Sequence, residues 1–314
     1  MTVSAPGNVL LLGEYAVLEE GGLGVAFSVD RRVRLSAQRA PRLSVEPASP
    51  IVSAVVAAAQ SVGTLPALPA LPALSALPAL PALSALRTLP ALRIRIDSSE
   101  LYLPDGRKAG FGSSAAVAVA LVRALHAPGT PGAAELELAL AAHRAAQGGV
   151  GSGYDVYCSF FGGWGLFSGG AKPSWEPHAA PGGARVYLFP GPAAVSTRNA
   201  IQSFLQWKNA QGDAACRLIQ ESNDNARAFL AARSARETAA AFRRSRRTGI
   251  ALGDEIGVEG RIPVPPGIDP ELCKAVGAGN ELGVYLQVPG APEPPAESAF
   301  LTVSESQDGV TWTP

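Results

Sequence analysis

KAGFGSSAAVAVALVRAL, residues 108–125, is the stretch from which the fold of this chain can be predicted. It begins with a tight loop of glycines and serines and continues as an unbroken run of small apolar residues, which predicts a buried helix. Glycine has no Cβ, so the backbone N–H groups of such a loop can approach a ligand closely. The helix N-terminus adds unpaired N–H groups and the positive end of the helix dipole. Loop and helix together predict a phosphate-binding site, although Gly/Ser loops also precede helices for purely structural reasons.

The composition excludes several classes of function. The chain has 314 residues, enough for one large domain or two ordinary ones. Its 26 Lys and Arg residues balance its 26 Asp and Glu residues, so no basic field attracts nucleic acid or an anionic membrane. It has no proline-free apolar stretch of about 18 residues and no cationic region typical of a secretory signal. We therefore expect a cytoplasmic protein with neither nucleic-acid nor membrane partners.

The cysteines and histidines give no sign of a metal centre or a hydrolase. Cysteines occur at positions 158, 216 and 273, too far apart for a metal-ligand spacing or a disulfide framework. The histidines, at positions 126, 143 and 178, show no pairing with serine or cysteine that indicates a catalytic triad. His143 lies in a predicted helix among small apolar residues, so we expect it to be a satisfied, partly buried side chain.

Residues 64–92 form a low-complexity insertion of Leu-Pro-Ala and Leu-Ser-Ala triplets. Its recurring prolines forbid a continuous helix and cannot lie in a central strand. The period of three fits a polyproline-II helix, which has three residues per turn. We favour a neutral insertion in a surface loop, because long loops cost little closure entropy. The alternative is an oligomerisation or partner surface formed by the leucines, and the sequence leaves the oligomeric state open, a homodimer included.

The remainder of the chain alternates strand and helix patterns. Strands are predicted at 9–12, 32–37, 92–101, 164–167, 184–189, 283–288 and 299–303. Helices are predicted at 49–62, in the apolar run that follows the Gly/Ser loop and ends at residue 125, and at 133–147. Further helices are predicted from 201 onward and at 212–247, the latter with an interruption near 223–225. Proline, glycine and tryptophan gather at 172–183, which is typical of a domain boundary. The sequence therefore predicts two domains, at 1–178 and 179–314.

Four motifs follow one another along the chain. They are Pro6-Gly7-Asn8 with GEYAVL at 13–18, GFGSSAA at 110–116, GSGYDV at 151–156 followed by Gly162-Gly163, and GAG at 277–279. In this order they resemble the GHMP kinase superfamily of small-molecule kinases, with the last motif degraded. Within the superfamily, GEYAVLE at 13–19, Lys108 and PAAVSTRN at 192–199 are most similar to phosphomevalonate kinases.

This resemblance implies an α+β, two-domain GHMP kinase fold, with an N-terminal domain like ribosomal S5 domain 2 and a ferredoxin-like C-terminal domain. It also implies a phosphotransferase that uses ATP and Mg²⁺ and takes a small-molecule phosphorylated acceptor. The likeness to phosphomevalonate kinases implies phosphorylation of (R)-5-phosphomevalonate to 5-diphosphomevalonate in the mevalonate route to isoprenoids. Two alternatives remain. One is another GHMP kinase, mevalonate kinase before the sugar kinases, and the other is a catalytically weakened paralogue that binds nucleotide or an isoprenoid phosphate.

The resemblance also assigns roles to residues of the motifs. The nucleotide phosphates would be held by Gly110, Gly112, Ser113, Ser114 and Ala115, with the Ser114 hydroxyl on Mg²⁺. Asp155 would orient or deprotonate the acceptor, with Lys108 as the nearest cation. The substrate side would comprise Asn8, Glu14, Tyr15, Ser152, Ser196, Gly277 and Gly279, among which Glu14 is expected to be mainly structural.

Three departures from the family pattern affect these assignments. Relatives carry Lys or Arg directly after the first Pro-Gly, where this chain has Asn8, and Lys108, Arg31, Arg32 and Arg198 are the candidate replacements. The third glycine motif has lost a glycine and has Asn280 or Glu281 in place of an aspartate. The segment 143–147 has no acid, whereas mevalonate kinases place a Mg²⁺-binding glutamate in the corresponding helix. Nucleotide binding is therefore more firmly predicted than catalysis.

Overall fold

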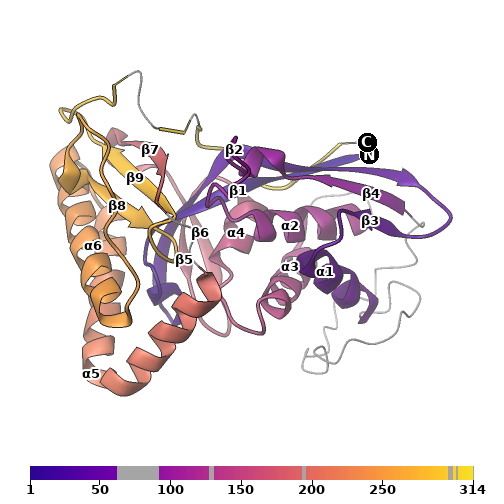
Figure 1. Ribbon diagram of the computed structural model, residues 1–314, viewed down its shortest axis with the longest axis horizontal. Coiled ribbons are helices and arrows are strands. Elements are labelled where there is room, and N and C mark those ends of the chain that lie inside the picture. Colours follow the sequence, from indigo (N-terminus) through magenta and orange to yellow (C-terminus); the bar gives the residue numbers. More distant parts are fainter. Residues whose placement is uncertain (62–91, 127–130, 193–195, 296–299, 302, 314) are drawn as a thin grey trace.

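The computed structural model describes residues 1–61, 92–126, 131–192, 196–295, 300–301 and 303–313. The predicted insertion at 64–92 lies outside the described residues except for Leu92, which begins a strand. The described chain is a mixed α+β structure, as expected, with two sheets and their covering helices (Figure 1). None of its described helices is long and apolar enough to cross a membrane.

The first sheet is built on two long strands, β1 (Thr2–Leu12) and β2 (Leu23–Arg39). Its strand order is β10-β1-β2-β4-β3, and β5 and β6 extend it from β2. The bounds of the other strands are Ser44–Glu46 for β3, Leu92–Asp97 for β4, Trp164–Ser168 for β5, Ser174–His178 for β6 and Thr311–Thr313 for β10. In β4 the alternation predicted from the sequence is visible, because Leu92 and Ile94 are buried whereas Arg93 and Arg95 are exposed.

Four helices cover one face of this sheet (Figure 1). They are α1 (Pro50–Ser61), α2 (Ser113–Leu125), α3 (Ala133–Ala146) and α4 (Tyr154–Phe161). Every residue of α2 from Ala115 to Leu125 is buried, because the helix packs against β1, β2 and the other three helices. Alanine and valine on all sides therefore predicted this central position correctly.

The second sheet has the order β7-β9-β8, and its strands are all antiparallel. These strands are β7 (Arg185–Pro190), β8 (Cys273–Val276) and β9 (Leu282–Gln287). Two long helices, α5 (Thr197–Leu230) and α6 (Ala235–Ile256), lie beside this sheet at the opposite end of the molecule from α1 (Figure 1). Short 3-10 helices occur at Ala16–Leu18, Ser99–Leu101, Pro181–Gly183 and Pro270–Leu272.

The predicted helix interruption at 223–225 is wrong. Helix α5 runs through these residues to Leu230, and its backbone is kinked at Gln211 instead, while the buried amides of Asn223 and Asn225 have partners. Asn223 Oδ1 accepts a hydrogen bond from the Leu23 backbone N–H at 2.8 Å, and Asn225 Nδ2 donates to Thr248 Oγ1 at 3.0 Å. These bonds tie α5 to β2 and to α6, so the asparagines serve packing between elements instead of ending the helix.

The C-terminal segment returns to the first sheet. The strand predicted at 299–303 includes positions outside the described residues, and Leu301 forms only an isolated bridge to Leu188. The last strand is instead β10, which pairs antiparallel with β1, so the two ends of the ribbon lie side by side (Figure 1). Arg32 anchors this segment by donating to the carbonyls of Asp308 and Gly309 at 3.1 and 2.6 Å.

Candidate active site

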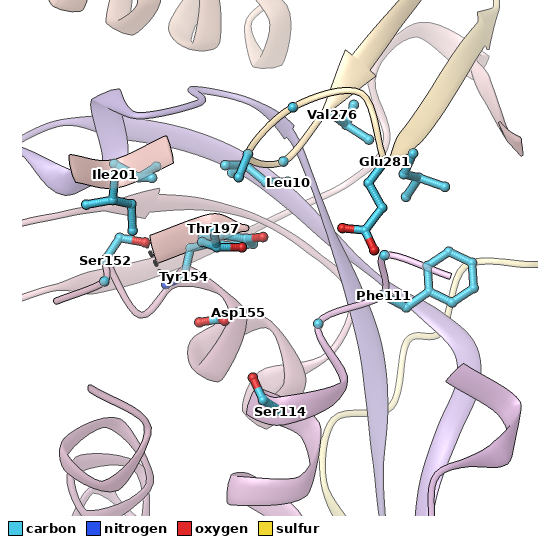
Figure 2. Close-up of a pocket in the computed structure, with 18 of the residues that line it drawn as sticks. Leu10, Phe111, Ser114, Ser152, Tyr154, Asp155, Thr197, Ile201, Val276 and Glu281 are labelled. Atoms are coloured by element: carbon cyan, nitrogen blue, oxygen red, sulfur yellow. Dashed lines mark hydrogen bonds between the residues drawn. The ribbon is translucent and has the colours of Figure 1, made fainter. Parts of the chain in front are cut away.

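A cleft of about 450 Å³ lies where the two sheets and their helices meet. Its walls come from the loop 110–114 before α2, the loop 148–153 before α4, the N-terminus of α5 and the turn 277–279 after β8. Segments far apart in the sequence thus converge on one cavity (Figure 2). Among its lining residues are the predicted site residues Tyr15, Lys108, Gly110, Gly112, Ser113, Ser114, Ser152, Asp155, Gly277 and Gly279.

The loop 110–114 has the backbone that its glycines predicted. Gly110 has φ 80° and Gly112 has φ 61°, both in the region that favours glycine. Gly112 is the N-cap of α2, and no side chain caps this helix. The loop lies on β1, where the Asn8 backbone N–H donates to the Phe111 carbonyl at 3.1 Å. The uncapped N-terminus of α2 therefore opens toward the cleft, which is the arrangement that binds anions.

Helix α4 carries Asp155 in its first turn. The helix begins after Gly153, whose φ of 91° lets the chain turn sharply out of the loop 148–153. The Asp155 side chain is 15% exposed, and its Oδ1 accepts a hydrogen bond from the Val156 backbone N–H at 3.0 Å. Ser114 of α2 and Thr197 line the same cleft as Asp155, and Figure 2 draws the carboxylate between them. A group bound in the cleft can therefore reach both Asp155 and the loop 110–114.

His143 contacts both Ser114 and Asp155, and the sequence analysis did not indicate these contacts. It projects from α3, and its Nε2 lies 2.9 Å from Ser114 Oγ and 3.5 Å from Asp155 Oδ2. His143 is hydrogen-bonded, as expected of a satisfied side chain, but it is almost fully buried, and its contacts with Ser114 and Asp155 were not predicted. The reason is that 29 residues separate His143 from Ser114 in sequence, and the contact forms only when α2, α3 and α4 pack together. The small residues of these helices, which let them approach closely, were the available signal.

The arrangement of Ser114, His143 and Asp155 is not that of a hydrolase triad. In a triad the acid binds one imidazole nitrogen and the serine binds the other, so that the base is oriented from behind. Here Ser114 and Asp155 both approach the same atom, Nε2. The contacts place a hydroxyl and a carboxylate next to one another instead of activating the hydroxyl.

Arg144, the neighbour of His143, shapes the loop 148–153. Its guanidinium donates to the Gly151 carbonyl at 3.1 Å and to the Ser152 carbonyl at 2.9 Å. Burial lowers the pKa of Arg144, and the charges of Tyr157 and Asp155 oppose that shift. The Ser152 side chain lines the cleft and accepts from the Tyr154 backbone N–H at 3.4 Å. Arg144 thus holds the loop through its backbone carbonyls, and the Ser152 side chain remains on the side of the cavity.

The third glycine turn is attached to the first motif in spite of its altered sequence. The Tyr15 hydroxyl donates to the Ala278 carbonyl at 2.7 Å. Glu14 forms a nearly buried ion pair with Lys274 of β8, whose Nζ also donates to the Leu11 carbonyl at 2.9 Å. Glu14 is not among the residues that line the cleft, although the sequence analysis groups it with the substrate side. These bonds keep Gly277 and Gly279 in the wall of the cleft.

The N-terminus of α5 closes the opposite wall. Thr197 and Ile201 line the cleft, whereas Ser196 is the helix cap and accepts from the Asn199 backbone N–H at 3.4 Å. A Cβ placed on Gly148 would lie 3.5 Å from Arg198 Nη2, so the Arg198 guanidinium reaches the loop 148–153. Thr197 was not assigned from the sequence, whereas Arg198 was named there as a candidate cation and Ser196 as a substrate-side residue of this helix end.

Two further predicted residues lie away from the cavity. Ala115 is fully buried in α2, and its N–H already donates to the Gly112 carbonyl at 3.1 Å. Asn8 is 1% exposed beneath the loop 110–114, where its Nδ2 donates to Ser159 Oγ at 3.0 Å and to the Asp155 carbonyl at 3.3 Å. Asn8 therefore supports the walls of the cleft from behind. Lys108, by contrast, is exposed at the rim.

The cleft offers oxygen donors to a hard cation. Ser114 Oγ and the Asp155 carboxylate both line it, and oxygen is the ligand that Mg²⁺ prefers. In the part of the chain that the structure describes, no group of three or more His, Cys, Asp or Glu side chains could hold a metal ion. The donor set fits an ion that takes one or two protein oxygens and completes its shell with substrate phosphates and water.

Comparison with known families agrees with this geometry. Residues 75–163, which include the loop 110–114 and Asp155, match the family model for the GHMP kinases N terminal domain. Over these residues the chain is similar to the N-terminal domain of GHMP kinases. No curated protein sequence matches the chain significantly.

Solved structures share the fold over almost the whole chain. A Listeria innocua protein, Lin0012, superposes with a TM-score of 0.74 at 17% identity, covering 99% of each chain. The phosphomevalonate kinase of Streptococcus pneumoniae, in complex with phosphomevalonate and AMPPNP, gives 0.67 at 14% identity, covering 91% of this chain and 92% of that one. The galactokinase of Lactococcus lactis gives 0.61 at 14% identity, covering 99% and 94%. The GHMP kinase fold is thus common to phosphomevalonate and sugar kinases, and such identities establish the fold alone.

Proposed function

We propose that this protein is an ATP-dependent small-molecule kinase whose acceptor is (R)-5-phosphomevalonate and whose product is 5-diphosphomevalonate. The observation that carries the proposal is the convergence on one cleft of an uncapped, glycine-rich helix N-terminus and the Asp155 carboxylate. The first suits a nucleotide phosphate, and the second suits the group that receives the transferred phosphoryl.

On the donor side, the loop 110–114 would hold the β- and γ-phosphates of ATP. Its backbone N–H groups and the dipole of α2 favour an anion at this position. Lys108 at the rim supplies a positive charge on the same side of the cleft. The Streptococcus pneumoniae kinase with this fold was solved with AMPPNP, an ATP analogue, which supports a nucleotide in this fold.

Mg²⁺ would be held by Ser114 Oγ and Asp155 together with the nucleotide phosphates. When bound, the ion neutralises charge on the phosphates and orients them. The contribution of the protein is to keep the hydroxyl and the carboxylate close to one another, as His143 does by contacting both.

On the acceptor side, the cleft can take a phosphorylated molecule. Ser152 and Thr197 present hydroxyl groups there, the N-terminus of α5 adds its dipole, and the Arg198 guanidinium reaches the adjoining loop. The rest of this wall is apolar and includes Leu10, Val17 and Ile201, which suits a short aliphatic body. These features favour a small aliphatic phosphate over an uncharged sugar.

Asp155 would act mainly by positioning. A phosphate acceptor has a second pKa of about 6, so it is already largely ionised at neutral pH and needs little proton abstraction. The carboxylate would then orient the attacking oxygen in line with the γ-phosphate and order the groups around it. A non-phosphorylated acceptor, with a hydroxyl nucleophile, would need Asp155 as a base.

An acceptor panel tests this proposal. The purified protein is incubated with ATP, Mg²⁺ and, in separate reactions, phosphomevalonate, mevalonate or galactose. ADP release is followed by a coupled assay, and the product is identified by mass spectrometry. We expect ADP and a diphosphate product with phosphomevalonate, and neither with the other acceptors. Turnover with mevalonate or galactose alone would refute the proposed acceptor and retain a kinase of another specificity.

A second function is favoured by one observation. Relatives carry a cation after the first Pro-Gly, whereas the buried Asn8 amide of this chain is engaged with α4 and provides no charge to the cleft. A site with fewer cations favours nucleotide binding without transfer. Binding of ATP in calorimetry, combined with no ADP from any acceptor of the panel, would establish this binding function in place of the kinase.

A further inference from the structure

His143 is the meeting point of three helices. It projects from α3, while Ser114 begins α2 and Asp155 begins α4. A single atom, His143 Nε2, lies 2.9 Å from Ser114 Oγ, 3.5 Å from Asp155 Oδ2 and 3.2 Å from Gln147 Nε2. The hydroxyl and the carboxylate that line the cleft are therefore both placed relative to one imidazole nitrogen.

His143 cannot itself meet a ligand. Its side chain is 2% exposed, and it is not among the residues that line the cleft, whereas Ser114 and Asp155 are. Any effect of His143 on a bound molecule must therefore pass through these two side chains. The helices α2, α3 and α4, which surround it, all pack against one another.

We propose that His143 is a positioning residue that fixes the Ser114 hydroxyl next to the Asp155 carboxylate on the wall of the cleft. The inference deepens the proposed function and rests on it, because it assumes that these two groups act in phosphoryl transfer. A hydroxyl can donate or accept a hydrogen bond, so the Ser114 contact is satisfied with either imidazole tautomer. Gln147 restrains the ring from the next turn of α3.

The physical reason is conformational. Without His143, the Ser114 hydroxyl is free to rotate, and a serine in a first helical turn can bond to nearby backbone instead. Asp155 would keep only its contact with the Val156 backbone N–H. Transfer between phosphates depends on alignment, and a displacement of about 1 Å can cost on the order of 100-fold in rate. The effect should appear in kcat, because the backbone groups of the loop 110–114 still bind the nucleotide.

Two substitutions separate positioning from bulk packing. His143→Leu fills the space without a polar atom, whereas His143→Gln restores a polar atom near the place of Nε2. We expect His143→Leu to lower kcat by roughly 10- to 100-fold, with KM for ATP nearly unchanged, and His143→Gln to recover most of the loss. His126→Gln is the matched control, since this histidine bonds to the Val122 carbonyl at the other end of α2. Equal losses in the Leu and Gln variants would overturn the proposal.

A double-mutant cycle with Ser114→Ala provides a second test. If His143 acts through Ser114, the losses in kcat from His143→Leu and Ser114→Ala should combine to much less than their product. If the two losses in kcat multiply fully, the two residues act independently and the inference is refuted.

Nuclear magnetic resonance tests the contacts of His143 without relying on enzyme activity. In unliganded protein with ¹⁵N-labelled histidine, Ser114→Ala and Asp155→Asn should each shift the ring signals of His143 and leave those of His126 in place. Unchanged His143 signals would refute the inference, whatever the enzyme does. Absence of turnover in the wild-type protein together with these shifts would refute the kinase proposal alone. The measurement does not depend on His143→Leu being able to fold.

Discussion

The Tyr15 hydroxyl donates a 2.7 Å hydrogen bond to the Ala278 carbonyl and so joins the turn after β1 to the third glycine turn. Tyr15 has φ 61°, which is unusual for a residue other than glycine, and its ring stacks on Phe204 of α5. The strained backbone is thus held by contacts with two separate elements. Burial, with the Glu14 charge as a second cause, raises the pKa of the Tyr15 phenol, so the hydroxyl keeps its proton at neutral pH.

Removing this hydroxyl should loosen the turn 277–279 without disturbing the nucleotide side. Tyr15→Phe keeps the stacking on Phe204 but leaves the Ala278 carbonyl without its donor, which should cost about 1 kcal/mol of unfolding free energy. We expect a higher KM for the acceptor and an unchanged KM for ATP. Tyr285→Phe is the control, because its hydroxyl bonds to the Pro292 carbonyl away from the cleft. Equal changes in acceptor KM in both variants would contradict this account.

The ion pair between Lys274 and Glu14 should matter for folding. Side-chain exposures of 3% and 11% leave little water to solvate either charge once its partner is removed. Lys274→Met should therefore lower the free energy of unfolding by about 3 to 5 kcal/mol in urea titrations. The double variant Lys274→Met/Glu14→Gln should recover part of this loss, since no buried charge remains. A double variant less stable than Lys274→Met would argue against the pair.

Asp155→Asn tests the transfer step by itself. The amide keeps the shape of the side chain and can accept from the Val156 backbone N–H, but it lacks the charge. We expect kcat to fall by about 10²- to 10⁴-fold, with ATP affinity in calorimetry close to that of the wild type. A variant that transfers phosphate at the wild-type rate would remove Asp155 from the mechanism.

Arg198→Ala tests the acceptor end of the cleft. If the guanidinium near Gly148 contacts the acceptor phosphate, its loss should raise KM for phosphomevalonate by roughly 10-fold and leave KM for ATP unchanged. Arg217→Ala, which removes an exposed arginine from the middle of the same helix, is the control. The effect should weaken as salt is added, because the contact is electrostatic. A parallel rise in both KM values would assign Arg198 to general stability.

The three cysteines should differ sharply in reactivity. Cys216 is exposed, whereas Cys158 and Cys273 are buried. Burial raises the pKa of the Cys273 thiol to about 12 and that of Cys158 well above its usual range, so neither forms the reactive thiolate near neutral pH. Intact-mass spectrometry after iodoacetamide treatment at pH 8 should find one label on the native protein, at Cys216. Urea-unfolded protein should take three. Labelling of Cys158 in the native state would contradict the fold around α4.

The glycine-rich loop and its helix could be predicted because their signal is local. The residues 110–125 combine a backbone that only glycine favours with a helix apolar on every side, and the structure confirms a buried α2 behind an uncapped N-terminus. The order of the motifs singled out Asp155, although the helix α4 that carries it was not predicted.

The parts that escaped prediction depend on contacts between distant segments. His143 lies on a helix whose small neighbours indicated only packing, and its contact with Asp155 requires three helices to be assembled first. The asparagines at 223 and 225 resembled a helix break, because their partners lie in β2 and α6. The strand β10 is short and exposed, and its pairing with β1 spans almost the whole chain, so no local pattern marks it.

The packing around the buried Asn8 side chain restricts which residues positions 8 and 112 can accept. The Asn8 side chain fills the space under Gly112, where even a Cβ would lie 2.4 Å from Asn8 Nδ2, and its amide also binds Ser159 of α4. A lysine at position 8 would bring a charged chain into this closed space. Introducing a lysine at position 8 therefore requires compensating changes in the surrounding packing, for example at Ser159, which is a case of epistasis. For enzyme engineering, the practical route to a more cationic cleft begins at the open rim, at positions such as 108 and 198.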